Sequence, residues 1–153
     1  MQGKKLNFYK IQPENSEHML ILSQIKTETP YLGDLTNYDF QSKGKGITGK
    51  NYFVENNGEI IGYIGLSEEI DTSIGKTVSL YYAVRKKYYG KGYGCLILDE
   101  ITQILKENTL IDCIVANVNN QNTFGIRTIE RANFKQVSEL SDDEEIQYHK
   151  YLR

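Results

Sequence analysis

The sequence predicts an α/β protein with a mixed, mainly antiparallel central sheet and flanking helices. Asn57-Gly58 separates two apolar runs, and an Asn-Gly pair in that setting is the strongest short-range signal for a β-hairpin. Residues 77–118 follow strand, helix and strand patterns in turn, and such a crossover places two parallel strands side by side. Hairpins combined with one parallel connection make the sheet mixed.

The first half of the chain contains one strand, one helix, a loop and a meander. Residues 6–11 alternate as a strand, and residues 13–26 carry apolar side chains at helical spacing after a proline that suits a helix start. Residues 29–50 are polar and rich in glycine, and a loop of this length is often functional. Antiparallel strands are expected at 52–55, 60–66 and 77–84.

The second half continues with alternating helices and strands. A helix from Cys95 to about Asn108 has one apolar face. A final hairpin is expected across the acidic turn at 141–145. The remaining elements are a strand at 110–118, a short helix at 122–132, and the two hairpin strands at 134–137 and 146–151.

The composition narrows the class of protein. A length of 153 residues predicts one domain over residues 1–153. The 18 Lys and Arg against 20 Asp and Glu give a formal charge of −2, which argues against a nucleic-acid partner. No apolar run reaches the roughly 18 residues of a membrane span, and no signal-peptide pattern is present. Cys95 and Cys113 are too few for a disulfide framework or a zinc site, so we expect no metal and a reduced, cytoplasmic location.

The first of two glycine-rich segments, residues 44–51, fits the spacing G-x-G-x-x-G and nearly fits a nucleotide P-loop. Both motifs need a strand before the loop and a helix after it, so that the helix N-terminus faces the phosphates. Here a strand pattern follows at once, and Asn51 stands where a magnesium-binding hydroxyl is required. We therefore interpret these residues as a surface loop.

The second glycine-rich segment, Tyr88-Tyr89-Gly90-Lys91-Gly92-Tyr93-Gly94, follows the strand ending at Val84 and opens the next helix. Glycines let backbone N–H groups approach an anion closely, and the helix dipole adds about half a positive charge at that end. Four basic residues between 85 and 91 place cations around the same turn. This segment predicts a pyrophosphate-binding loop.

Residues 84–94 resemble the acyl-CoA loop of the GNAT N-acetyltransferase superfamily, (Q/R)-x-x-G-x-(G/A). Residues 122–134, NTFGIRTIERANF, are similar to N-x-x-(S/A/G)-I-R-x-x-E-(K/R)-x-G-F, a form frequent in the ribosomal-protein N-terminal acetyltransferase subgroup. The spacing of the two motifs and the order of the elements also agree, so the resemblance covers nearly the whole chain. It implies a GNAT-like acyl-CoA N-acyltransferase fold.

The resemblance also implies a set of binding residues. Backbone groups of Tyr82, Ala83 and Val84 would pair with the pantetheine arm in a gap between the two parallel strands. Lys87 would contact a phosphate, and Asn122 would hydrogen-bond the arm. The pyrophosphate would be held by backbone N–H groups of Tyr89, Gly90, Lys91, Gly92, Tyr93 and Gly94.

The residues that move protons in the family are missing. Val78 and Ser79 occupy the strand position that usually holds the general-base carboxylate, and Asn117 occupies the position that another subgroup uses. Ile129 stands where the family often has its acid, a tyrosine. The catalytic candidates are therefore Glu68 and Asn117, which would hold a water as base. Glu68 can also be read as an exposed acid in a turn, and Asn117 as a strand amide with no catalytic role. An acceptor amine of low pKa would need no base at all.

Four other positions have structural readings. Tyr89 replaces the family's Gln or Arg, which matters little where the backbone does the binding. Asn133 replaces a glycine after a helix, and Asn tolerates the left-handed backbone next best after glycine. His18 and His149 are expected at the surface.

By resemblance, the protein would transfer an acetyl group from acetyl-CoA to a primary amine, by direct attack in a ternary complex. The acceptor would be a small molecule or a protein N-terminus, bound beside the first helix and the loop at 29–50. We expect a monomer or homodimer with no membrane or nucleic-acid partner. Because the proton-transfer residues are missing, the alternative is a non-catalytic acyl-CoA-binding sensor or interaction module on the same fold.

Overall fold

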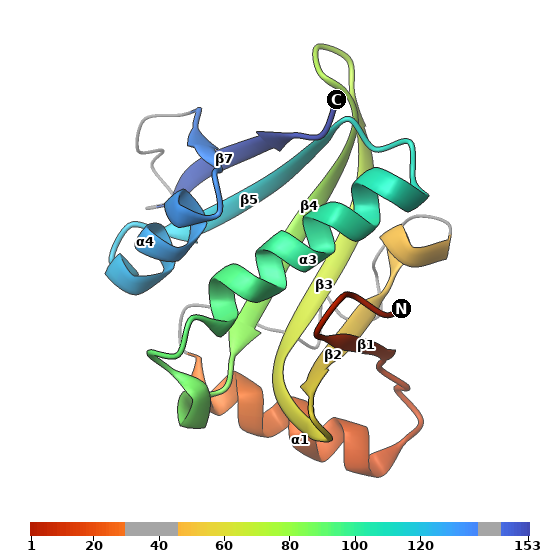
Figure 1. Cartoon of the computed structure of the whole chain (residues 1–153), viewed down its shortest axis with the longest axis vertical. Coiled ribbons are helices and arrows are strands. Elements are labelled where there is room, and N and C mark those ends of the chain that lie inside the picture. The colour runs from red at the N-terminus through yellow and green to blue at the C-terminus, as the bar shows by residue number, and fades with distance from the viewer. Residues whose placement is uncertain (30–45, 138–144) are drawn as a thin grey trace.

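The computed structural model describes residues 1–29, 46–137 and 145–153 (Figure 1). Most of the expected loop at 29–50 and of the acidic turn at 141–145 lies outside the described residues. In chain order the elements are β1 (Asn7–Lys10), α1 (Ser16–Glu28), the 3₁₀ turn η1 (Gly46–Gly49), β2 (Asn51–Asn56), β3 (Glu59–Asp71), β4 (Gly75–Val84), the 3₁₀ turn η2 (Lys86–Tyr88), α3 (Tyr93–Asn108), β5 (Cys113–Asn119), α4 (Thr123–Arg131), β6 (Lys135–Gln136) and β7 (Glu145–Tyr151).

The strands of the described residues form one seven-stranded sheet in the order β1-β2-β3-β4-β5-β7-β6. Neighbouring strands are antiparallel except β4 and β5, which pair in parallel from Thr77–Cys113 to Leu80–Ala116. The mixed, mainly antiparallel sheet is therefore confirmed, as is the parallel pairing across residues 77–118. The Asn-Gly hairpin is confirmed too: Asn57 and Gly58 have φ values of 52° and 82°, as a type I′ turn requires.

β3 and β4 extend further than the sequence pattern indicates. They pair as far as Asp71 and Gly75. Oδ1 of Asp71 accepts hydrogen bonds from the backbone N–H groups of Ser73 (2.8 Å) and Ile74 (3.2 Å), which closes the turn there. Glu68 therefore lies within β3 and not in a turn, so its reading as an exposed turn acid is wrong.

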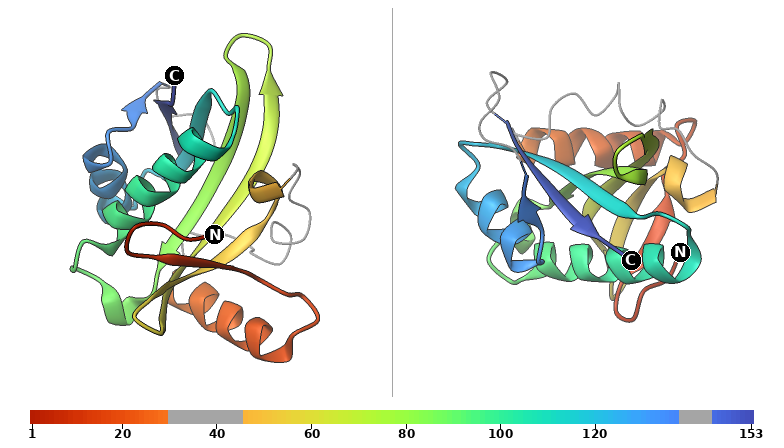
Figure 2. Two further views of the ribbon diagram at one scale, coloured as in Figure 1. Left: turned by 45° about the vertical axis from the view of Figure 1, so that its right-hand side comes forward. Right: turned by 90° about the horizontal axis from the view of Figure 1, so that it is seen from above.

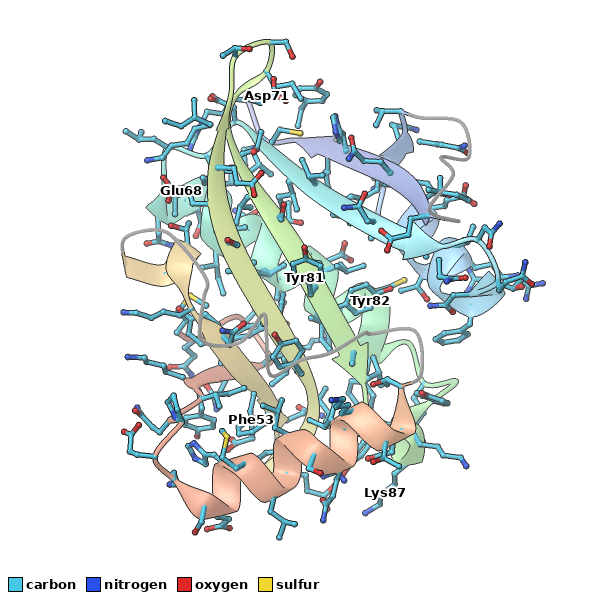
Figure 3. The ribbon with its side chains drawn as sticks, turned by 180° about the vertical axis from the view of Figure 1, so that it is seen from behind. Phe53, Glu68, Asp71, Tyr81, Tyr82 and Lys87 are labelled. Carbon is cyan, nitrogen blue, oxygen red and sulfur yellow. The ribbon has the colours of Figure 1, made fainter. Side chains whose placement is uncertain are left out.

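Different helices cover the two faces of the sheet (Figure 2). α3 and α4 lie on one face, over the larger core, to which β1–β5 and β7 contribute. α1 lies on the other face of the sheet and covers only the end of that face near Phe53 and Tyr81. β5 and β7 are not covered by this helix (Figure 3). The smaller core under α1 contains Ile11, Leu22, Ile25, Phe53, Tyr63 and Ala83. The apolar side chains on the two faces of the sheet therefore belong to two separate cores.

Glu100 is a buried carboxylate of α3 that fixes the N-terminal turn. Its two oxygens accept hydrogen bonds from the backbone N–H groups of Lys5 (3.1 Å) and Leu6 (3.0 Å). A Cβ added at Gly3 would lie 2.0 Å from Oε1, so a larger residue there would displace this carboxylate. Glu100→Ala leaves these N–H groups unpaired, so we expect a loss of about 1.5–3 kcal/mol in the free energy of unfolding, measured by urea denaturation. Glu107→Ala, an exposed position on the same helix, is the control and should change it by less than about 0.5 kcal/mol. Equal effects of the two variants would contradict this role.

The described residues contain no helix that is long and apolar enough to span a membrane. In the same residues, no three His, Cys, Asp or Glu side chains are grouped so as to hold a metal ion. Cys95, which is half-buried, and Cys113, which is buried, are both free thiols.

Candidate functional site

The glycine loop joins the end of β4 to the start of α3. Gly90 and Gly92 have φ values of 76° and 81°, which favour glycine strongly. An added Cβ at either position would meet no described atom within 4 Å, so the backbone conformation and not crowding requires glycine. α3 begins at Tyr93, two residues earlier than expected, and its first turn therefore includes Tyr93 and Gly94.

The N-terminus of α3 is open. Its N-cap is Gly92, no described side chain caps it, and its first turn contains no acidic residue. The N–H group of Leu96 bonds to the carbonyl oxygen of Gly92 at 3.2 Å, so the N–H groups of residues 93–95 precede the intrahelical bonds. Together with the positive end of the helix dipole, these groups fit an anion. The geometry is that expected for pyrophosphate binding.

Two lysines stand beside the loop. The Nζ atoms of Lys87 and Lys91 lie 5.5 and 5.7 Å from the centre of the Tyr88 ring, within reach of cation–π attraction. The Tyr88 hydroxyl donates to Glu59, and this hydrogen bond, followed by the charge of Lys87, lowers the pKa of the Glu59 carboxyl. Both lysines are exposed and can contact a phosphate from solvent.

The last residue of α1, Glu28, binds the segment that leads into the glycine loop. Its Oε2 lies 3.1 Å from Nη2 of Arg85, and its Oε1 accepts a 3.0 Å hydrogen bond from the N–H of Lys86. Its carbonyl oxygen accepts a 3.1 Å hydrogen bond from the Tyr89 hydroxyl. The charge of Arg85 is therefore paired, and α1 is attached to the start of the loop.

β4 and β5 diverge beside the glycine loop (Figure 1). Their parallel ladder ends at Leu80 and Ala116, although both strands continue. Tyr82, Ala83 and Val84 pair with β3 on one side, and their edge toward β5 has no strand partner among the described residues. Such an edge can pair with an extended chain inserted between two strands. The gap between the strands and the open end of α3 therefore lie at the same end of β4.

α4 packs closely against α3 next to this gap. A Cβ at Gly94 would lie 2.8 Å from Cγ2 of Thr128, so the two helices approach through this glycine. Asn122 is the N-cap of α4, and its Oδ1 accepts a 2.9 Å hydrogen bond from the N–H of Gly125. The cap uses Oδ1 of Asn122, and the amide nitrogen Nδ2 is the donor of this side chain. Asn133 has a φ of 67°, which confirms the expected left-handed backbone after this helix.

Glu68 and Asn117 are not brought together. Glu68 faces the α3 side, where its Oε1 lies 2.8 Å from Nζ of Lys76 and its Oε2 accepts from the Thr48 hydroxyl. It lines a cavity of about 1040 Å³ beside the C-terminal end of α3, the end opposite the glycine loop. Both neighbours of Asn117 in β5 belong to the core under α3, so Asn117 faces the opposite side. The prediction that Glu68 and Asn117 hold one water is wrong for this reason.

Asn117 lies where the strands separate. It is exposed and is the first residue of β5 beyond the parallel ladder, and its Oδ1 accepts a 3.3 Å hydrogen bond from Nε2 of Gln147. Ile129 is fully buried in the core under α3, so the side chain there has no proton to give.

Both histidines are less exposed than expected. His18 is half-buried, and its Nδ1 accepts a 3.0 Å hydrogen bond from the N–H of Gln12. His149 is only 8 % exposed, and its Nε2 lies 3.1 Å from Oε1 of Gln147. The alternation at 146–151 places His149 and Gln147 on one face of the strand, and the pairing of Gln147 with Asn117, which the sequence does not show, puts that face on the side of Asn117.

Comparison with known proteins gives one family. Residues 17–134 match the acetyltransferase (GNAT) family. A comparison with curated proteins finds no match.

Solved structures with the same fold include three informative cases. A GNAT-family acetyltransferase from Bacillus anthracis has a TM-score of 0.73 at 15% identity, with 99% of this chain and 98% of that chain covered. An aminoglycoside N(6')acetyltransferase from Legionella pneumophila has a TM-score of 0.73 at 19% identity, with coverage of 99% and 95%. A spermidine N-acetyltransferase from Vibrio cholerae, in complex with CoA and spermine, has a TM-score of 0.72 at 11% identity, with coverage of 97% and 96%.

These likenesses, all below 25% identity, agree with the fold of this chain. The family match extends from the first helix to the end of the second motif and so covers most of the sequence. The chain belongs to the acetyltransferase (GNAT) family.

Proposed function

We propose that this protein is an acetyl-CoA-dependent N-acetyltransferase that acts on a primary amine of a small molecule. The observation that carries the proposal is the uncapped N-terminus of α3 next to the edge of β4 that β5 leaves unpaired. A pyrophosphate and an extended arm attached to it would satisfy both groups of backbone donors and acceptors at once.

The binding roles follow from this arrangement. The N–H groups of residues 89–94 would bind the pyrophosphate, and Lys87 would contact a phosphate from the edge of the loop. The backbone of residues 82–84 would pair with the pantetheine arm on one side, and the amide of Asn122 would donate to it on the other. When bound, acetyl-CoA supplies the acetyl thioester.

The chemistry then requires little more than alignment. The protein must hold a neutral amine near the carbonyl carbon, so that a C–N bond forms as the C–S bond breaks. Asn117 lies where β4 and β5 separate and would orient the amine through its side-chain amide. Placing the two reactants in line can supply about 7–11 kcal/mol of the barrier reduction.

The acceptor class is inferred from the structural neighbours. The enzymes from Legionella pneumophila and Vibrio cholerae are named for an aminoglycoside and for spermidine, both small molecules with amino groups. A protein N-terminus is the other acceptor to test, because residues 122–134 resemble the ribosomal-protein N-terminal acetyltransferase subgroup. We further propose a monomer or homodimer of one domain, working in the cytoplasm.

A non-catalytic acyl-CoA sensor remains the second candidate. It is favoured by the apolar or amide side chains at Val78, Asn117 and Ile129, which cannot act as the acid or base that the family uses.

One experiment separates these functions. Acetyl-CoA, CoA and ATP are titrated into the purified protein by calorimetry, and thiol release is then followed with spermidine, an aminoglycoside and a peptide with a free α-amine. We expect acetyl-CoA to bind and thiol release to occur with a small-molecule amine. Binding without release on any amine would favour the sensor, and release with the peptide alone would assign the N-terminal acceptor. No binding of acetyl-CoA would overturn the proposal.

A further inference from the structure

Two large aromatic side chains are exposed beside the glycine loop. Tyr89, which precedes Gly90 in the loop, is 44 % exposed, and Phe124, in the first turn of α4, is 55 % exposed. Their ring centres lie 6.0 Å apart, and the ring planes are inclined by 32°. Side chains from two separate elements therefore form one exposed aromatic surface, which we call the Tyr89–Phe124 pair.

Packing of the protein interior does not explain this pair. Within the described residues, neither ring belongs to the core under α3 or to the core under α1. The buried residues of α4 are Gly125, Thr128 and Ile129, so Phe124 is not on the buried face of its helix. A single exposed apolar residue is common, whereas adjacent exposed aromatic rings often mark a binding site.

Both rings are attached to fixed parts of the structure. The Tyr89 hydroxyl donates a 3.1 Å hydrogen bond to the carbonyl oxygen of Glu28 at the end of α1. Phe124 follows the N-cap Asn122, and its own carbonyl oxygen accepts a 2.9 Å hydrogen bond from the Thr128 hydroxyl. A planar ligand would therefore meet rings that are already in position, so little ordering is needed when it binds.

The pair lies next to the proposed pyrophosphate site. Tyr89 begins the segment 89–94, whose N–H groups would hold the pyrophosphate, and α4 lies on the same side of the molecule as this loop (Figure 1). In CoA the pyrophosphate joins the pantetheine arm to adenosine 3′-phosphate. Because the arm would enter the gap between β4 and β5, the adenosine would leave the pyrophosphate on the outer side, where the exposed rings lie.

The chemistry of the pair and its surroundings fits this part of CoA. Adenine has a flat π face, and bases stack readily on aromatic side chains. Arg127 is exposed and follows Phe124 by three residues, so it lies on the same side of α4. Its guanidinium and the exposed ammonium group of Lys91 in the loop provide positive charge for the 3′-phosphate.

We propose that the Tyr89–Phe124 pair is the adenine subsite of the acyl-CoA cofactor, with the base stacked on Phe124; this rests on the cofactor binding in the proposed function. The pair holds the end of CoA that does not react. It therefore increases the affinity for acetyl-CoA and leaves the transfer of the acetyl group unchanged.

The first test compares two acetyl donors by isothermal titration calorimetry. Phe124→Ala should raise the Kd for acetyl-CoA about 5–150-fold, the range for loss of one stacked base. The same variant should leave unchanged the Kd for acetyl-4′-phosphopantetheine, which lacks the adenosine. Phe124→Tyr keeps an aromatic ring and should restore the affinity. Leu110→Ala, an exposed position at the other end of α3, is the control and should change neither Kd.

A spectroscopic test follows from the composition of the chain. The sequence contains no tryptophan, so Phe124→Trp introduces a single indole at the subsite. Acetyl-CoA and adenosine 3′,5′-bisphosphate should quench its fluorescence, because the base stacks on the indole, whereas acetyl-4′-phosphopantetheine should not. Leu110→Trp places the indole at the other end of α3, where none of the three ligands should quench it.

The outcomes distinguish the subsite from the proposed function. A wild type that does not bind acetyl-CoA overturns both. If the wild type binds acetyl-CoA and Phe124→Ala binds it equally well, the subsite alone is overturned. An equal loss of affinity for the two acetyl donors would mean that Phe124 contacts the pantetheine arm, which also overturns the adenine assignment. Equal quenching of Phe124→Trp and Leu110→Trp would do the same.

Discussion

Replacing Gly92 with valine is expected to raise the Kd for acetyl-CoA at least 100-fold. Gly92 is the N-cap of α3 and has a φ of 81°, where a Cβ costs about 1–2 kcal/mol and a β-branched residue more. The chain at the N-cap will therefore move toward negative φ and turn the N–H groups of the first helical turn away from the pyrophosphate. A 100-fold loss corresponds to about 2.7 kcal/mol of binding free energy. Isothermal titration calorimetry measures it directly.

Gly58→Val is the matched control. Gly58 has a φ of 82° and, like Gly92, has no described atom within 4 Å of an added Cβ, but it lies in the β2–β3 hairpin. Both variants should lower the melting temperature by similar amounts, whereas only Gly92→Val should weaken acetyl-CoA binding. An unchanged Kd in Gly92→Val, or an equal loss in both variants, would show that the loop does not bind the pyrophosphate.

Tyr63→Ala is expected to be the most destabilising of the substitutions considered. Tyr63 is fully buried between β3 and α1, and its hydroxyl donates a 2.9 Å hydrogen bond to Oδ1 of Asn51. Removing a buried aromatic ring leaves a cavity and costs about 3–5 kcal/mol. For a chain of this size that lowers the melting temperature by about 6–20 °C, which differential scanning calorimetry resolves.

Tyr63→Phe separates the ring from its hydroxyl. It keeps the packing and leaves Asn51 without one donor, so the expected loss is about 1–2 kcal/mol. Equal destabilisation by the two variants would mean that the hydrogen bond, and not the packing of the ring, stabilises this core. An effect of Tyr63→Ala below 1 kcal/mol would mean that the core under α1 tolerates a cavity.

The two cores lie on opposite faces of the sheet, so the proposed cofactor side and acceptor side should be separable by substitution. The core under α3 holds the helix whose N-terminus would face the pyrophosphate, whereas α1 packs on the opposite face and contacts Arg85, just before the loop, through Gln24 and Glu28. Substitutions under α1 should therefore act first on the acceptor side and on the attachment of the loop.

Much of the fold was predictable because its signals are local. The Asn57-Gly58 turn, the left-handed Asn133 and the glycines before α3 each depend on the conformational preferences of one or two residues. Likewise, the proposed pyrophosphate loop is a contiguous segment whose backbone N–H groups would do the binding. A strand, a glycine-rich turn and a helix in that order place the N–H groups without help from distant residues.

The sheet face on which Glu68 and His149 lie could not be predicted in this way. It depends on the phase of alternation in β3 and β7, and a shift of one residue reverses it. That phase is fixed by which neighbours enter the core under α3, as Leu66 and Tyr148 do. From sequence spacing alone, Glu68 was the nearest acid and His149 a surface residue.

The chain thus encodes the glycine loop locally, in glycines and a helix start, because the backbone geometry that the proposed pyrophosphate site uses follows from short-range sterics. The placement of Asn117, Gln147 and His149 on one face, with Glu68 on the other, is a property of strand register across the assembled sheet. Register is set by pairing between residues far apart in sequence and by which side chains the core can bury, so it exists only in the folded protein.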